Sequence, residues 1–201
     1  MLLLLLATVL YSFPLGDALE MVVDDRERLC MVDWKYREAI DKFHNKLRQR
    51  VAWGATVNGK ELGPEREMYG LVYDCALEKE ANNEAKLPGY ADLFHRGLVR
   101  FSGEHKGSAL SAVEKALKTL YNDENAMRQL IYPKATRFGC WGTLSKGKKK
   151  GHQRIDWVCV YDKKPADGES LEGRNSCNED KDCTYYKGST CVSDLCYTYY
   201  V

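Results

Sequence analysis

Eight cysteines that follow an apolar leader constrain this chain more than any other feature of its sequence. The leader runs from Met1 to Leu10 and fades at Gly16 and Ala18. It has the length of a signal-peptide core and is too short to span a bilayer. We therefore expect residues 1–18 to be a signal peptide and the mature chain to be secreted into the extracellular space. In that oxidising compartment, an even number of cysteines predicts four disulfides.

Composition narrows the class of partner. The roughly 180 residues after the leader are enough for one domain with a core and a small appendage. The chain has 30 basic and 29 acidic side chains, a balance that argues against dedicated nucleic-acid binding. We expect no later segment to cross a membrane, because none has a long apolar run.

Cysteine density divides the chain into two parts. Four cysteines are spread thinly from Cys30 to Cys159, and four crowd between Cys177 and Cys196. The polar, turn-rich stretch 162–170 between the two groups has the composition of a linker. The sequence therefore predicts a main domain over 30–162 and a disulfide-rich tail over 175–201.

Periodicity predicts three helices followed by strands. An apolar stripe at three- and four-residue steps marks the first helix, which Gly54 ends; its members are Tyr36, Ile40, Phe43, Leu47 and Val51. Asp74 caps a second helix over 75–86, and a third spans 108–123. Residues 137–144 and 155–161 resemble strands joined by a polar hairpin connection, 145–154. Helices followed by strands indicate an α+β fold of packed layers.

The strand assignment also favours particular disulfides. Cys140 and Cys159 fall on the two proposed strands, so a bridge across the hairpin is geometrically natural and contributes about 3 kcal/mol in the chain-entropy model. The tail cysteines most easily reach one another, as Cys177–Cys191 with Cys183–Cys196 or in another internal pairing. This leaves Cys30 to pair with Cys75.

Histidines offer two weak signals of chemistry. His44 lies beside the apolar stripe of the first helix, and a lone histidine there is typical of a hydrogen-bonded core-edge residue. His95 and His105 are placed on one loop, with Glu104 alongside, but a spacing of ten residues does not enforce a zinc site. We interpret this pair as exposed loop histidines.

One cluster of positive charge stands out on the expected hairpin. Its members are Lys146, Lys148, Lys149, Lys150, His152 and Arg154. Such a cluster either contacts sulfated glycans or anionic lipid heads, or is simply a solvated turn. The tail is rich in tyrosine, which serves either as a contact surface or as a small core; these residues are Tyr185, Tyr186, Tyr197, Tyr199 and Tyr200.

Several sequence blocks carry a family resemblance. The helix segment Phe43–Gly54 (FHNKLRQRVAWG) is followed in order by 68–81, by 129–140, by the strand 157–161 and by the cysteines of 177–196. Together they resemble the CAP superfamily (SCP/TAPS), especially its nematode branch of Ancylostoma-secreted and venom-allergen-like proteins. The resemblance implies an α-β-α sandwich with a small Cys-rich C-terminal extension.

The chain departs from the family at its metal site. Many members hold a divalent metal in a central cavity with two His and two Glu. Here Ala126 stands in place of one His and Ala91 in place of one Glu. The segment of the other His is shortened between Lys86 and Gly89, and Glu124 is a loose match to the second Glu. We therefore expect no bound metal and no cofactor.

The functional expectation is binding rather than catalysis. An even disulfide set leaves no thiol nucleophile, and no Gly-x-Ser-x-Gly elbow occurs. The resemblance implies a secreted, non-enzymatic protein that binds a host protein or cell-surface receptor, with a role in immune modulation. An alternative is a sterol or fatty-acid carrier with an apolar groove between helices, lined by residues such as Leu110, Val113 and Leu117. A metal-dependent hydrolase is the least favoured class.

Overall fold

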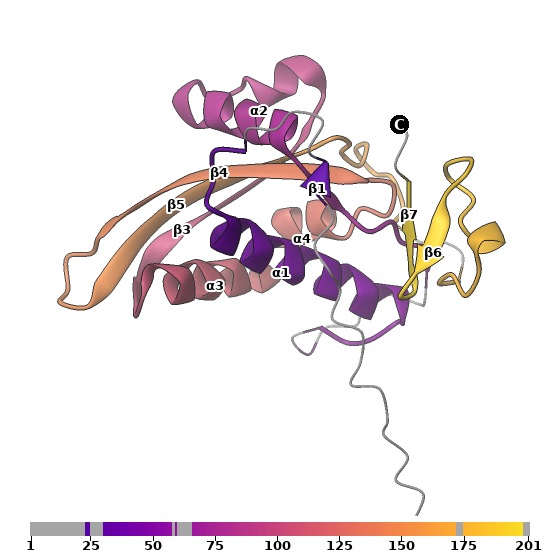
Figure 1. Cartoon of the computed structure of the whole chain (residues 1–201), viewed down its shortest axis with the longest axis horizontal. Coiled ribbons are helices and arrows are strands. Elements are labelled where there is room, and N and C mark those ends of the chain that lie inside the picture. Colours follow the sequence, from indigo (N-terminus) through magenta and orange to yellow (C-terminus); the bar gives the residue numbers. More distant parts are fainter. Residues whose placement is uncertain (1–22, 25–29, 58, 60–65, 172–174, 199–201) are drawn as a thin grey trace, which may run out of the picture.

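A mixed five-stranded sheet forms the middle of the molecule (Figure 1). The computed structural model describes residues 23–24, 30–57, 59, 66–171 and 175–198, so the expected signal peptide, Tyr199 and Tyr200 lie outside the described residues. The strands, in sheet order, are β1 (Val23–Asp24), β2 (Val72–Asp74), β4 (Arg137–Lys146), β5 (His152–Tyr161) and β3 (Gly97–Lys106). The first two pairings are parallel and the last two are antiparallel.

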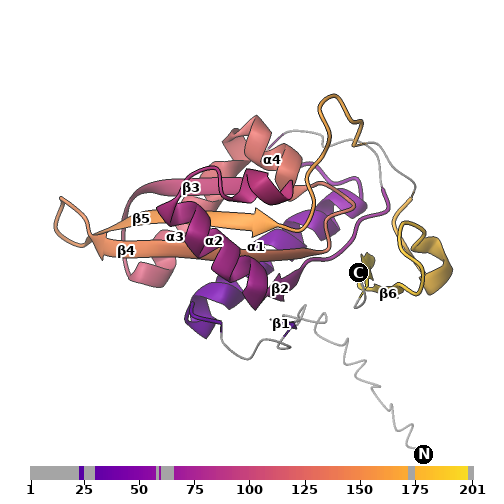
Figure 2. The same ribbon diagram turned by 90° about the horizontal axis from the view of Figure 1, so that it is seen from above.

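Helices cover both faces of this sheet. Figures 1 and 2 show α2 (Cys75–Lys86) on one face, and α1 (Trp34–Ala52), α3 (Ala109–Thr119) and α4 (Glu124–Leu130) on the other. Short 3-10 turns, η1 (Ala91–Phe94) and η2 (Leu120–Asn122), follow α2 and α3. The predicted α-β-α sandwich with a Cys-rich C-terminal extension is therefore confirmed.

Side-chain caps explain where the helices begin. Asp33 and Asp74 accept hydrogen bonds from the first-turn backbone N–H groups of α1 and α2, and Ser108 and Asp123 do the same for α3 and α4. The predicted helix over 75–86 matches α2. The predicted helix over 108–123 consists of α3 and η2 in succession, whereas α4 is a short helix that the sequence pattern did not reveal.

Strand β3 corrects one prediction. Residues placed on a loop between His95 and His105 instead form a ten-residue strand, whose first half alternates strictly between buried and exposed side chains. β3 pairs with β5 over its whole length, from Gly97–Tyr161 to Lys106–His152. The strands also extend further into the hairpin than predicted, so that only 147–151 connects β4 to β5.

Buried polar side chains attach α1 to the rest of the molecule. Asn45 exchanges two hydrogen bonds with the backbone of Leu71, at 2.8 and 3.0 Å. The His44 ring lies 2.6 Å from the hydroxyl of Tyr161 and 2.7 Å from the carbonyl oxygen of Ile40. The side chains of His44 and Asn45 in the FHNKLR segment are therefore structural contacts in the core, as expected for His44.

Two buried groups on α1 have opposite effects on stability as pH changes. Burial raises the pKa of Asp41 to about 7, so folding favours its protonated form and the free energy of unfolding falls as pH rises from about 4 to 7. Burial lowers the pKa of His44 to about 4, so the free energy of unfolding rises with pH between about 4 and 6.5. The two contributions oppose each other over the same range.

Replacing Asp41 by Asn should separate these contributions. Asn keeps an oxygen that can accept the hydrogen bond from Asn45, so we expect the variant to be more stable than the wild type at pH 7, by on the order of a few kcal/mol. The difference should shrink towards pH 4, where Asp41 is protonated in the folded chain. Urea denaturation at several pH values measures it, with the exposed Asp156→Asn as control. Equal stability of D41N and wild type at pH 7 would contradict the argument.

The tail packs tightly against the main body. It contains η3 (Asp180–Asp182), β6 (Thr190–Val192) and β7 (Leu195–Tyr197). The carbonyl oxygen of Cys196 accepts a hydrogen bond from the Gly70 N–H at 2.8 Å, and the backbone N–H of Cys196 donates one to the carbonyl oxygen of Met68 at 2.9 Å. Leu195 and Tyr197 belong to the main hydrophobic core. The tail cysteines thus fasten a segment that completes the core.

The connection between the main body and the tail is also held in place. Glu169 accepts hydrogen bonds from the Tyr132 hydroxyl and from the ammonium group of Lys134, and Arg128 donates to the carbonyl oxygens of Ala166 and Glu169. A segment with the composition of a linker therefore follows a defined course along α4.

Candidate functional site

A groove between α1 and α3 is a concave site formed by described residues. Its volume is about 430 Å³, and its walls come from α1, α3 and η2. Phe43, Leu47, Leu117 and Tyr121 supply the apolar surface, with the rings of Phe43 and Tyr121 5.3 Å apart. The apolar stripe of α1 explains this floor, because Leu47 faces the core while Phe43 remains half-buried at its edge.

Four basic side chains and one acidic side chain, Glu114 of α3, surround the groove. Lys42, Lys46 and Arg50 rise from α1, and Lys118 from α3. Lys42 is paired with Glu38 at 2.6 Å, and Arg50 donates to the carbonyl oxygen of Thr56. In the part of the chain that the structure describes, no ion pair engages Lys46 or Lys118. An apolar floor beneath two such cations fits an apolar chain with a negatively charged head.

The groove differs from the one expected from the sequence. Leu117 lines it, but Val113 is fully buried in the core and Leu110 does not line it. Lys46, Lys118 and Tyr121 were not predicted. Their only sequence signal is that they flank apolar helix positions, and pairing the two walls requires knowing that α1 lies beside α3.

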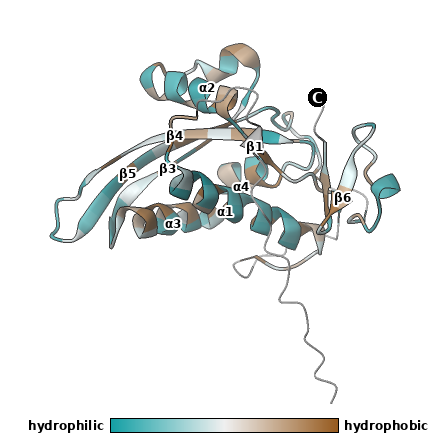
Figure 3. Ribbon diagram, viewed as in Figure 1, coloured by the Kyte–Doolittle hydropathy of each residue, from teal (hydrophilic) through white to brown (hydrophobic). Residues whose placement is uncertain are grey.

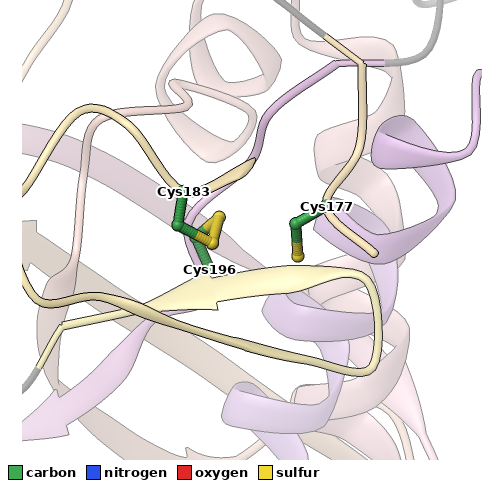
Figure 4. A group of neighbouring side chains, drawn as sticks. All are labelled: Cys177, Cys183 and Cys196. Carbon is green, nitrogen blue, oxygen red and sulfur yellow. A yellow bond between two sulfur atoms is a disulfide. The ribbon is translucent and has the colours of Figure 1, made fainter. Parts of the chain in front are cut away.

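The four disulfides of the structure link Cys140–Cys159, Cys30–Cys75, Cys177–Cys191 and Cys183–Cys196. Cys140 and Cys159 are direct cross-strand neighbours in the β4–β5 register. In the tail, the sulfur atoms of Cys177, Cys183 and Cys196 lie within 4.8 Å of one another (Figure 4). The described tail tyrosines serve the core, since Tyr197 is buried and the rings of Tyr185 and Tyr186 pack against Tyr69.

The histidine pair does not form a site. His95 follows η1 in the left-handed conformation with φ of 53°, whereas His105 is near the far end of β3, opposite Gln153. An extended strand of this length separates the two residues by about 25 Å. The interpretation of both as residues of one loop is therefore wrong, because β3 carries His105 away from His95.

Among the described residues, one group of three or more His, Cys, Asp or Glu is close enough to share an ion: Cys177, Cys183 and Cys196. All three sulfurs are in disulfides, which do not supply the thiolate ligands of a metal. The residues at the aligned family positions, Ala91 and Ala126, carry no ligand atom. Outside the disulfides, the described side chains therefore bring together no set of three His, Cys, Asp or Glu ligands.

The predicted cationic cluster lies at the far end of the β4–β5 hairpin, which projects beyond the helices (Figures 1 and 2). Lys146 ends β4, Arg154 lies on β5, and Lys148, Lys149 and Lys150 form the connection. All five side chains are exposed.

The fold and the paired cysteines define a class of protein. Residues 42–161 match the Cysteine-rich secretory protein family (CAP), so the chain belongs to this family. The chain is 61% identical to the solved structure of Ancylostoma-secreted protein Ac-ASP-7, with a TM-score of 0.80, covering 90% of this chain and 99% of that one. A structure described as manganese-bound Ac-ASP-7 is 60% identical with a TM-score of 0.79 and the same coverage.

A curated relative extends the comparison. Ancylostoma secreted protein from Ancylostoma caninum is 25% identical over 186 residues. That alignment covers 81% of this chain but 42% of the relative, so the chain spans less than half the length of that protein. Secreted relatives and four disulfides are consistent with an extracellular location. No described helix is both long and apolar enough to cross a bilayer.

Proposed function

We propose that the chain is a secreted, non-enzymatic CAP protein that binds an amphiphile in the groove between α1 and α3. The observation that supports this function is the combination of a groove of about 430 Å³ with an apolar floor and cations on both walls. Pockets of small-molecule ligands have volumes of this size and a few polar groups that orient the ligand. Basic side chains outnumber Glu114, the acidic residue of the lining, by four to one, so the groove favours a fatty acid, whose carboxylate compensates their charge, over a neutral sterol.

A protein partner is the second candidate, as the family resemblance implies for host proteins or receptors and for immune modulation. Exposed apolar side chains around η1 favour it: Leu87, Leu93 and Phe94 are 62%, 71% and 50% exposed. Large apolar side chains gathered on a surface are typical of protein contacts. This surface lies on the α2 side of the sheet, away from the groove.

A metal-dependent hydrolase is not supported. One relative is described as manganese-bound, but the described residues of this chain bring together no ligand set outside the disulfides.

Fatty-acid binding tests the groove. We expect Ala39→Phe, which places a ring in the groove, to abolish displacement of a fluorescent fatty acid. Lys46→Ser with Lys118→Ser should weaken fatty-acid binding about thirtyfold, since each of the two lost charge contacts contributes about 1 kcal/mol, but should leave binding of the corresponding fatty alcohol unchanged.

Leu93→Ser with Phe94→Ser is the matched control. It should leave fatty-acid binding intact and weaken any binding to host cell-surface proteins. If neither groove variant changes fatty-acid binding, the groove is not the site. Two results together would favour the protein partner: the wild-type chain binds no fatty acid, and the Leu93→Ser, Phe94→Ser variant loses the receptor binding that the wild type shows.

A further inference from the structure

Positive charge is concentrated at one end of a nearly neutral molecule. The whole chain has a net charge of +1, yet the far end of the hairpin holds Lys146, Lys148, Lys149, Lys150 and Arg154. Lys106, at the end of β3, lies beside this group, because it is the cross-strand neighbour of His152 on β5. The backbone N–H of the next residue, Gly107, donates a hydrogen bond to the carbonyl oxygen of Gly151. Glu104 and Asp156 are the acidic residues of the neighbouring strand positions. The result is a local excess of positive charge.

The hairpin connection has a fixed backbone. Gly147 donates to the carbonyl oxygen of His152 at 2.9 Å, and His152 donates to that of Lys149 at 3.0 Å. The carboxylate of Glu104 on β3 accepts the Lys149 backbone N–H at 3.0 Å. Backbone hydrogen bonds from Lys149 and Lys148 lower the pKa of Glu104.

The cationic side chains of the hairpin end are not engaged by acidic side chains of the described chain. The carboxylate of Glu104 accepts a hydrogen bond from the backbone of the connection, and among the described residues it forms no ion pair with an ammonium group. Across the described ranges, no ion pair engages Lys146, Lys148, Lys149, Lys150 or Arg154. The ammonium groups of 148–150 are therefore presented to solvent on an ordered turn, which lowers the entropy lost when a ligand binds.

We propose that this hairpin end, defined by Lys106, Lys146, Lys148, Lys149, Lys150 and Arg154, binds a sulfated polysaccharide. A linear polyanion with repeated sulfates matches a row of lysine point charges, which do not need planar or stacked partners. The four disulfides are typical of a protein in an oxidising, extracellular environment. Intracellular polyanions are absent from that environment, so they are not the expected ligand.

Two other anionic partners fit the surface less well. A membrane-binding surface usually adds apolar side chains that insert between lipids, and the exposed large apolar residues of the described chain all lie outside 144–154. The end of the hairpin is correspondingly hydrophilic in Figure 3. Single-stranded nucleic acid is held partly by aromatic stacking, and residues 142–156 contain no aromatic side chain other than histidine.

Heparin binding tests the proposal. Wild-type protein should be retained on heparin at low salt and released as salt rises, because exposed charges are screened within about 10 Å at 0.1 M. Replacing Lys148, Lys149 and Lys150 with Ser should weaken binding to a heparin oligosaccharide about tenfold to hundredfold. The variant should keep its melting temperature, since the three side chains are exposed.

The matched control removes the same charge elsewhere. Lys79, Lys86 and Lys187 are exposed and lie outside the groove, and their replacement with Ser should leave heparin affinity nearly unchanged. An equal loss in both triple variants, or no loss in the hairpin variant, would overturn the proposal. So would equal binding of unsulfated hyaluronan, or binding to phosphatidylserine–phosphatidylcholine vesicles without binding to heparin. Fatty-acid binding by the hairpin variant should be normal, which separates this site from the groove.

Discussion

Replacing Arg48 by Met should destabilise the chain by more than about 4 kcal/mol and prevent recovery of folded protein at 37 °C. Arg48 is fully buried on α1, and burial lowers the pKa of its guanidinium to about 10, so it stays charged at neutral pH. Its nitrogens donate to carbonyl oxygens of Tyr69 at 2.6 Å and Leu130 at 2.8 Å, and to three more in 132–135.

The large effect follows from what the substitution leaves behind. Met fills much of the same volume but leaves five buried carbonyl groups without this donor, and each unsatisfied group costs about 1–3 kcal/mol. These carbonyls belong to the approach to β2 and to the stretch from the last residue of α4 to β4, so Arg48 joins segments far apart in the sequence.

Chemical denaturation measures this loss. Arg48→Lys should be intermediate if it folds, because an ammonium group has three donors and lacks the planar fork that reaches several carbonyls. The control is Lys46→Met, an exposed change on the same helix that should alter stability by less than about 0.5 kcal/mol. An R48M chain within about 1 kcal/mol of wild type would show that the carbonyls find other donors.

Replacing Gly139 by Ala should be almost as damaging, because α2 packs backbone-to-backbone on β4 at this residue. A Cβ at position 139 would lie 2.6 Å from the carbonyl oxygen of Asp74 and closer still to backbone atoms of Leu77 and Glu78. Backbone cannot rotate away as a side chain can, so the first turn of α2 must shift. We expect a loss of about 3 kcal/mol or more, at the upper end of overpacking effects.

Gly97→Ala is the matched control in another strand of the same sheet. Its Cβ would meet the side-chain amide of Gln129, the flexible end of a side chain that can move. We expect a smaller loss, limited mainly to the hydrogen bond from Gln129 to the carbonyl oxygen of Lys163. Thermal unfolding of both variants gives the comparison. Equal melting temperatures for G139A and G97A would contradict the backbone-contact explanation.

Much of the fold was predictable because local signals agreed with one another. Asp74 and the spacing of apolar residues located α2, and alternating apolar residues located β4 and β5. β3 was missed because its second half is exposed and polar, and because it contains Gly97 and Gly103. Its strand conformation is imposed by ten residues of pairing with β5, a partner about fifty residues away in sequence. α4 was missed because seven residues are too few for a clear helical period.

The candidate sites divide in the same way. The lysines of 146–150 were visible in the sequence as a charge cluster, because neighbours along a hairpin remain neighbours in space. The groove was not visible, since Phe43 and Lys118 meet only when α1 and α3 pack side by side. The predicted lining residue Val113 turned out to be core, because periodicity identifies an apolar face without showing whether that face is covered or left open.

By itself, the sequence predicted secretion, the start of α2 at its capping Asp74, the hairpin and its charge, and the family resemblance. These are properties of residues close together in the chain, where caps, periodicity and composition act. Only the tertiary structure decided that Arg48 donates to carbonyl oxygens of two segments far from α1 in sequence, that Cys196 docks the tail beside Met68 and Gly70, and that α1 and α3 enclose a groove. Such contacts depend on packing between distant segments, for which a single sequence carries no local signal.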